Sequence, residues 1–165
     1  MKNNLFSKVK EYLKGKIAIV GIGNALKGDD QLGPLLISRL QGKTKARLFD
    51  CGEVPENYIQ PIIKYKPETI IIVDASDWGG GVGELRLIKK EEIKNFGFST
   101  HNASLGLFFD YLERELPQTN IIIIGVQVGK RGLMQSPSPE VEAALNELVD
   151  FFTRKEAIRE DFSLR

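Results

Sequence analysis

Three polar residues of this sequence, Asp30, Asp74 and His101, stand where a predicted strand ends or a predicted helix begins. Because parallel strands end at one edge of a sheet, residues that are distant in the sequence can meet there. Two carboxylates and one imidazole form a donor set that suits zinc, nickel, iron or manganese, and affinity order alone does not choose among these metals. The three residues therefore indicate a metal-binding or catalytic site.

Each of these residues also has an ordinary structural explanation. An aspartate such as Asp30 at a helix start often caps the helix or interacts with its dipole. Asp74 could form a turn at the end of its strand, and His101 could be a simple hydrogen-bonding residue. Chemistry is indicated by the combination of the three, not by any one of them.

A dinucleotide site is the first rival hypothesis. Gly21 and Gly23 follow a strand, as in a glycine fingerprint, and Asp50 ends the second strand where a ribose-binding acid would lie. However, Leu26 occupies the position of the third glycine. The acidic pair Asp29–Asp30 would also repel a pyrophosphate at the helix N-terminus. Both observations count against the dinucleotide hypothesis.

A nucleophilic site is the second rival. Cys51 and His101 are the one cysteine and the one histidine of the chain, so no other Cys–His pair exists. Cys51 follows a strand that need not lie near His101. The chain also lacks the G-x-S-x-G motif of serine hydrolases. The sequence therefore does not favour a covalent nucleophile.

The hydrophobic pattern predicts the elements that position these residues. Apolar or alternating runs predict strands, and stripes at helical spacing predict helices. Continuous β-branched runs predict strands buried on both faces of a parallel sheet. We expect a three-layer α/β/α sandwich with a mostly parallel, five-stranded twisted sheet, in which 84–88 is an antiparallel edge strand and 96–102 is connecting loop. The predicted strands are 17–20, 46–50, 69–74, 84–88 and 120–128, and the predicted helices are 32–40, 58–65, 103–116 and 139–154.

Composition limits the class of protein. The 165 residues predict a single domain, 1–165, in which 1–16 is an N-terminal helical extension and 155–165 a charged tail. The extension either packs on the domain edge or docks a partner. With 23 basic and 22 acidic residues, charge gives no argument for nucleic acid or a membrane surface. One cysteine, a polar N-terminus and no apolar run of about 20 residues lead us to expect a cytoplasmic protein without a signal peptide or a membrane span.

Five motifs in register across residues 16–152 carry a family resemblance. They read GIGNALKGDDQLGP, CGEVPEN, IVDASD, GGVGELRLI and STHNASL. In these motifs the chain resembles the maturation endopeptidases of nickel–iron hydrogenases, and most closely the type that serves formate-hydrogenlyase-like and related energy-converting hydrogenases. The resemblance implies a phosphorylase/hydrolase-like fold.

The resemblance also implies an activity. Such an enzyme removes a short C-terminal peptide from the large-subunit precursor of the hydrogenase once nickel has been inserted. Its metal-binding and catalytic residues would be Asp30, Asp74 and His101. The nickel would come with the substrate and act as the recognition signal, so we expect no permanent metal, with zinc or cadmium as substitutes. Expected partners are the precursor and maturation chaperones, and the free enzyme is expected to be a monomer.

Several points stay open at this stage. Gln31 stands where the family usually has glycine and could line the cleft, and Asp29 is expected to cap the helix or to support the site. Trp78 and Gly79–Gly81 could grip the substrate tail or form a mobile loop. Hydrolysis could use a metal-polarised group or the carboxylates as acid and base. The alternative functions are a nickel-recognising chaperone that does not cleave and a nucleotide-binding domain.

Overall fold

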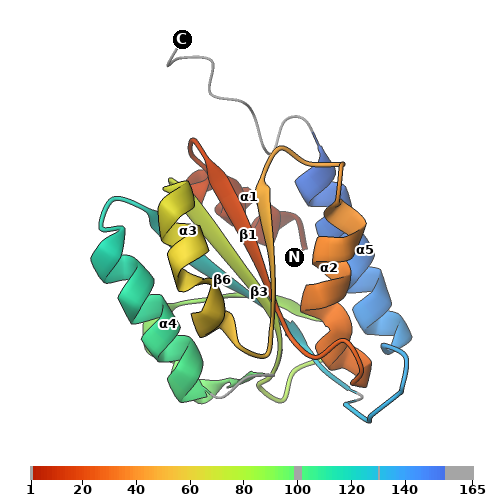
Figure 1. Cartoon of the computed structure of the whole chain (residues 1–165). Coiled ribbons are helices and arrows are strands. Elements are labelled where there is room, and N and C mark those ends of the chain that lie inside the picture. Colours follow the sequence, from red (N-terminus) through yellow and green to blue (C-terminus); the bar gives the residue numbers. More distant parts are fainter. Residues whose placement is uncertain (1, 99–101, 130, 155–165) are drawn as a thin grey trace.

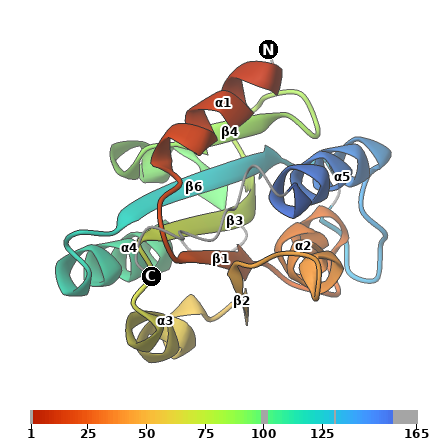
Figure 2. The same ribbon diagram turned by 90° about the horizontal axis from the view of Figure 1, so that it is seen from above.

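In the computed structural model, which describes residues 2–98, 102–129 and 131–154, a six-stranded sheet carries helices on both faces (Figure 1 and Figure 2). The strand order is β2-β1-β3-β6-β4, and β5 pairs with β3. Neighbouring strands are parallel except for β4 on β6 and β5 on β3. The strands are β1 (Ile17–Ile22), β2 (Arg47–Gly52), β3 (Thr69–Asp77), β4 (Leu85–Ile88), β5 (Gly97–Phe98) and β6 (Asn120–Gln127).

This architecture confirms the predicted α/β sandwich and its antiparallel edge strand, β4. The predicted strand count was wrong, because the described residues form six strands and not five. The extra strand, β5, is two residues long, too short to show a sequence pattern. It exists because β3 continues past Asp74 and offers Ser76 and Asp77 as partners for Phe98 and Gly97. The expected end of this strand at Asp74 was therefore also wrong.

The helices fall into two groups, one on each face of the sheet. Helices α1, α2 and α5 share a core with Ile71, Val73 and Ala75 of β3. Helices α3 and α4 share the other core with Ile70 and Ile72. Period-two alternation along a strand buried on both faces explains this division. The helices are α1 (Lys2–Tyr12), α2 (Leu32–Leu40), α3 (Ile59–Tyr65), α4 (Asn102–Glu115) and α5 (Pro139–Thr153), with 3₁₀ turns η1 (Gly28–Gln31), η2 (Pro55–Tyr58) and η3 (Lys90–Asn95).

The N-terminal helix α1 packs on the domain. Val9 is fully buried, and the ring of Phe6 stacks on Phe151 of α5 with ring centroids 4.7 Å apart. After the helix, the backbone N–H of Lys14 donates to Thr69 Oγ1 at 2.9 Å. These contacts agree with the packed-helix alternative for the N-terminal segment. None of the helices in the described ranges has the length and apolar character needed to cross a lipid bilayer.

Helix α2 lies unusually close to β1, and two glycines allow it. A Cβ on Gly21 would lie 2.5 Å from the carbonyl oxygen of Gly33, and a Cβ on Gly33 would lie 2.1 Å from the carbonyl oxygen of Ile22. Any side chain at either position would force the helix away from the strand. The glycine that suggested a nucleotide fingerprint, Gly21, therefore serves strand–helix packing.

Candidate active site

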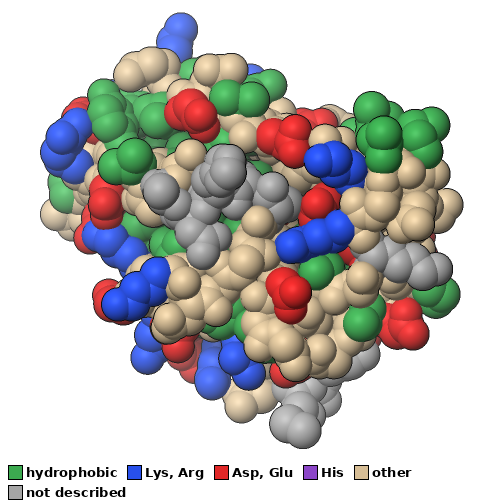
Figure 3. Space-filling view, turned by 90° about the horizontal axis from the view of Figure 1, so that it is seen from below, with side chains coloured by type: hydrophobic (Ala, Val, Ile, Leu, Met, Phe, Trp, Pro, Cys, Tyr) green, Lys and Arg blue, Asp and Glu red, His purple; other side chains and the backbone are tan. Residues whose placement is uncertain are grey.

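Two of the predicted site residues, Asp30 and Asp74, lie at the carboxyl edge of the sheet. The last residue of β1, Ile22, is in register with Asp74 of β3. The chain then turns back over the end of β1, where the N–H of Asn24 donates to the carbonyl oxygen of Asp30 at 3.0 Å. Asp74 is fully buried and Asp30 is nearly so. Figure 3 views the molecule from this end, where acidic and basic side chains lie side by side.

The position of Asp74 in β3 determines which face of the sheet it belongs to. It continues the alternation of Ile70 and Ile72, which pack toward α3 and α4. Helix α4 begins at Asn102, one residue after His101 in the sequence. His101 itself lies outside the described residues, so the third member of the predicted set stays a prediction.

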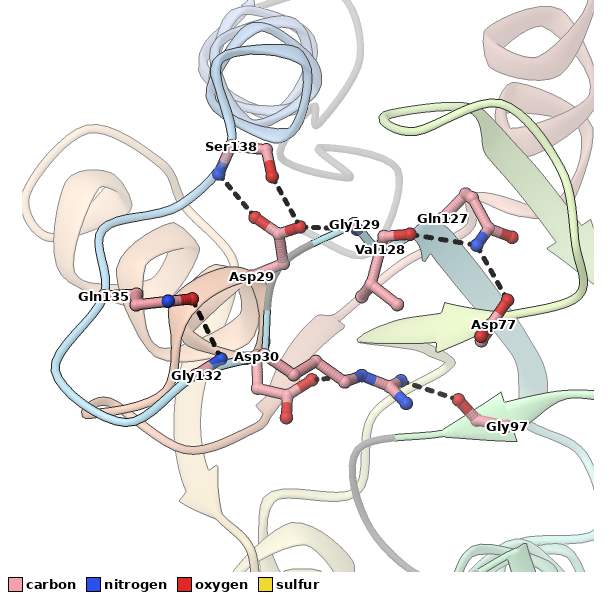
Figure 4. A network of polar contacts seen from close by, with 11 residues as sticks. Asp29, Asp30, Asp77, Gly97, Gln127, Val128, Gly129, Gly132, Gln135 and Ser138 are labelled. Carbon is pink, nitrogen blue, oxygen red and sulfur yellow. Dashed lines mark hydrogen bonds and ion pairs between the residues drawn. The ribbon is translucent and has the colours of Figure 1, made fainter.

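The carboxylate of Asp30 forms an ion pair with Arg131. The Nε–H of Arg131 donates to Asp30 Oδ1 at 3.1 Å, and its terminal NH₂ donates to the carbonyl oxygen of Gly97 at 2.8 Å. Figure 4 shows Asp30 and Gly97 at the two ends of this bridge. Burial raises the pKa of Asp30, and the charge and hydrogen bond of Arg131 partly oppose this effect. The site thus contains a carboxyl group that is readier to accept a proton than an ordinary aspartate.

The neighbouring Asp29 has a structural role. Its Oδ1 accepts the N–H of Ser138 at 2.5 Å, and its Oδ2 accepts the Ser138 hydroxyl at 2.8 Å and the N–H of Gly129 at 2.6 Å (Figure 4). Both Asp29 and Ser138 are buried. Because these donors lie on the segment between β6 and α5, Asp29 joins that segment to η1. Asp29 thereby supports the η1 turn that carries Asp30.

Further bonds join the same two segments, residues 24–31 and 129–138, which we call the site loops. The side-chain amide of Gln31 donates to the carbonyl oxygen of Gln135 at 2.7 Å, so this residue ties the loops together at the position where the family usually has glycine. The backbone adds a bridge between Lys27 and Leu133 and bonds from Gly28 N to Gln135 O (3.1 Å) and from Met134 N to Leu26 O (2.6 Å). The two loops therefore form one structural unit beside Asp30.

The segment after β3 is pinned by Gln127 of β6. Its Oε1 accepts the N–H groups of Trp78 (3.0 Å) and Gly80 (3.1 Å), and its Nε2 donates to Asp77 Oδ1 at 2.9 Å. The Trp78 ring packs edge-on against Phe96, with centroids 5.5 Å apart. Trp78 is thus half-buried and packs against the core cluster that contains Phe96, and its role toward a substrate stays a prediction.

The structure offers no support for the rival nucleophile. Cys51 is buried, and this burial, with a smaller contribution from the charge of Asp50, raises the pKa of its thiol. A buried thiol with a raised pKa is a poor nucleophile. Asp50 is exposed, and its Oδ1 accepts the N–H of Gly52 at 3.2 Å. The expected end of the second strand at Asp50 was wrong, because β2 continues to Gly52.

Sequence reasoning missed Arg131, Gln127 and Ser138. All three follow or end β6, which terminates at the same edge of the sheet as β1 and β3. This position was the available signal, since residues at the carboxyl edge are candidates for any site there. Their partners, Asp29, Asp30 and Asp77, could not be assigned in advance. The pairing depends on the path of the loop after β6, and no recognisable sequence motif specifies that path.

The donor set can be compared with the demands of a divalent metal. Within the described ranges, no group of three or more His, Cys, Asp or Glu side chains is arranged to hold a metal ion, and His101 is outside those ranges. Asp30 already pairs with the cationic side chain of Arg131, so a metal ion at this carboxylate would have to displace that side chain. By donor type alone, the carboxylates of Asp30 and Asp74 and the imidazole of His101 would suit a borderline metal such as nickel or zinc.

Comparison with known proteins gives consistent results. A family model described as hydrogenase maturation protease matches residues 32–155. The hydrogenase 3 maturation protease of Escherichia coli K12 is 36% identical over 109 residues, which cover 64% of this chain and 69% of that protein. The crystal structure of the nickel–iron hydrogenase maturation protease HycI from Thermococcus kodakarensis superposes with a TM-score of 0.78 at 31% identity, covering 92% of this chain and 98% of that one. The solution structure of the E. coli endopeptidase HycI gives 0.76 at 29% identity, covering 86% and 91%.

Proposed function

This chain belongs to the hydrogenase maturation protease family and is a peptidase, and on that premise we propose that it removes the C-terminal peptide of a nickel–iron hydrogenase large-subunit precursor after nickel insertion. The observation that carries the proposal is the position of two buried carboxylates at the carboxyl edge of the sheet in a chain of this family. Asp30 lies in η1, which follows β1, and Asp74 lies in β3 in register with Ile22, the last residue of β1. A carboxylate pair at such an edge can receive a ligand that approaches from the surface.

We propose that Asp30, Asp74 and His101 bind the nickel that the precursor carries. Two carboxylates supply hard oxygen donors and the imidazole supplies a borderline nitrogen donor, a combination that nickel accepts. An empty precursor lacks the cation that these groups would attract. This difference would let the enzyme discriminate the nickel-loaded precursor from the empty one, so nickel would act as the recognition signal.

Two routes of hydrolysis use the same residues. In one, the substrate's nickel polarises the scissile carbonyl or a water molecule. In the other, the carboxyl groups act as general acid and base, a role that the raised pKa of Asp30 supports because it brings this group closer to working pH. In both routes Asp30 would lie beside the reacting bond. Asp29 would hold η1 in place through its bonds to Ser138 and Gly129.

The proposal extends to the setting of the reaction. We propose that the enzyme works as a free monomer in the cytoplasm, where it meets the precursor together with its maturation chaperones. A buried, free cysteine is compatible with a reducing compartment.

Intact-mass spectrometry of the precursor tests the proposal. Nickel-loaded and nickel-free precursors are each incubated with the wild-type protein and with Asp30→Asn, Asp74→Asn and His101→Ala. The expected result is loss of a C-terminal peptide from the nickel-loaded precursor with the wild-type protein alone among these four. Asp50→Asn is the matched control, because it changes an exposed carboxylate in β2 that is not one of the three proposed site residues, and it should leave cleavage intact.

Three outcomes contradict the proposal in different ways. Cleavage that survives all three substitutions would mean that the site lies elsewhere. Equal cleavage of both precursors would remove nickel as the signal. A nickel-loaded precursor that binds the protein but keeps its full mass would favour the chaperone alternative.

A further inference from the structure

The guanidinium of Arg131 is held at two points of the candidate site. One contact is the 3.1 Å bond to Asp30 Oδ1 on η1, and the other is the 2.8 Å bond to the carbonyl oxygen of Gly97 on β5. Strand β5 is hydrogen-bonded to the end of β3, three residues beyond Asp74. Arg131 therefore spans from one predicted metal-binding carboxylate to the strand that precedes His101 in the chain.

This arrangement sets Arg131 in competition with any metal ion at Asp30. An arginine and a divalent cation are both positive, so each is disfavoured by the other at one carboxylate. Arginine does not lose its proton at any working pH. The competition can therefore be relieved by movement of the side chain but not by its titration. The Arg131 side chain is 35% exposed, which leaves room for such movement.

A second carboxylate is available to the displaced side chain. Asp77 is exposed and lies at the end of β3. Hydrogen bonds from Gln127 and from the N–H of Gly79 lower the pKa of Asp77, and the positive charge of Arg131 makes a smaller contribution in the same direction. Arg131 thus lies within electrostatic reach of Asp77, so its charge would not be left unbalanced after leaving Asp30.

We propose that Arg131 competes with free divalent cations for Asp30, so that this carboxylate binds a metal ion only when the ion is carried by the precursor. We call this competition the guard. The proposal rests on the proposed function and adds a specificity-determining residue to it. A free ion must displace Arg131 with the energy of its own coordination alone. A precursor also makes protein–protein contacts, which offset the loss of the two Arg131 bonds.

Metal binding to the full chain tests the guard directly. Nickel(II) chloride and zinc(II) chloride are titrated into the wild-type protein, Arg131→Gln and Arg131→Lys by calorimetry. Arg131→Gln keeps a polar side chain but removes the charge, and we expect it to bind both ions about two- to fivefold more tightly, the size of effect that loss of one partly exposed ion pair allows. Arg131→Lys keeps the charge but cannot make both bonds of the arginine, so its metal affinity should fall between those of the wild-type protein and Arg131→Gln.

Two controls separate the guard from a general change in charge. Arg39→Gln is the matched variant, because Arg39 is 33% exposed and pairs with Glu142 on α5, at the opposite end of α2 from Asp30. It should bind metal as the wild-type protein does. In the double variant Arg131→Gln/Asp30→Asn the gain in affinity should disappear, because the guard acts through Asp30.

A cleavage assay with added zinc(II) gives a second readout. Cleavage of the nickel-loaded precursor by the wild-type protein should resist concentrations of zinc(II) that inhibit Arg131→Gln. Unchanged metal affinity in Arg131→Gln, or a gain that persists without Asp30, would overturn the guard even when the wild-type protein cleaves normally. Failure of the wild-type protein to cleave any precursor would instead overturn the proposed function.

Discussion

Replacing Asp29 by Asn tests whether this buried carboxylate holds the site loops together. The change keeps the shape of the side chain but turns one oxygen into an NH₂ donor. In the wild-type protein Oδ1 accepts the N–H of Ser138, while Oδ2 accepts the Ser138 hydroxyl and the N–H of Gly129. Whichever oxygen is replaced, the new donor faces a backbone N–H. One backbone N–H, that of the buried Ser138 or that of the exposed Gly129, must then lose its partner.

The cost follows from the type of bond that is lost. A hydrogen bond to a charged group contributes about 1.5–3 kcal/mol, against about 0.5–1.5 kcal/mol for a neutral bond. Asp29→Asn loses one such bond and weakens the others, while it also avoids burying a charge. We expect a net loss of about 2–4 kcal/mol in the free energy of unfolding. For a chain of this length that corresponds to a fall in Tm of roughly 4–16 °C.

Urea unfolding of Asp29→Asn, Ser138→Ala and the double variant measures this effect. Ser138→Ala removes the hydroxyl bond alone and should cost about 1–2 kcal/mol. The double variant should lose about 1 kcal/mol less than the sum, because the two groups share a bond. Asp110→Asn is the control, since Asp110 is an exposed carboxylate paired with Lys90 and should change stability by less than about 1 kcal/mol. Asp29→Asn within about 0.5 kcal/mol of the wild-type protein, or strict additivity, would refute this account of Asp29.

Three further predictions follow from the structure. Because the pKa of Asp30 is raised, its contribution to stability is present at low pH and is lost as pH rises through that pKa. Asp30→Asn lacks this titration, so its stability relative to the wild-type protein should increase over the same rise in pH. Urea unfolding at several pH values measures the difference. Cys51 should react with a thiol reagent at the rate of opening or unfolding, since its thiol is buried with a raised pKa; fast labelling of the native protein would contradict this. Gly21→Ala should cost about 2 kcal/mol or more in thermal unfolding, because its Cβ would lie 2.5 Å from the Gly33 carbonyl oxygen, and a variant as stable as the wild-type protein would show that α2 can move.

The layered fold was predictable because its main signals are local. The run from Thr69 to Val73 is β-branched throughout, and such a run forms a strand that is buried on both faces. Pro139 marked the start of α5 and Pro117 the end of α4. Strand β5 was not predictable, since its two residues pair with β3 only because β3 extends to Asp77. That extension depends on partners elsewhere in the sheet.

The candidate site was predictable in part. The strand-end rule and the family resemblance both selected Asp30 and Asp74, and the structure has both at one sheet edge. The bonds that hold this edge join residues about a hundred positions apart, such as Asp29 with Ser138 and Asp30 with Arg131. No periodicity or motif specifies such pairs, because they depend on how the loop after β6 returns past η1.

The bonding between the site loops has a consequence for making chimaeras of this chain with its relatives. Residues 24–31 and 129–138 are joined through Gln31 and Gln135, through the bridge of Lys27 with Leu133, and through Asp29. If only one of these segments were replaced by that of a relative, its hydrogen-bond donors and acceptors would not match those of the segment that was kept. The smallest transplantable module at this edge is therefore discontinuous, consisting of both segments exchanged together.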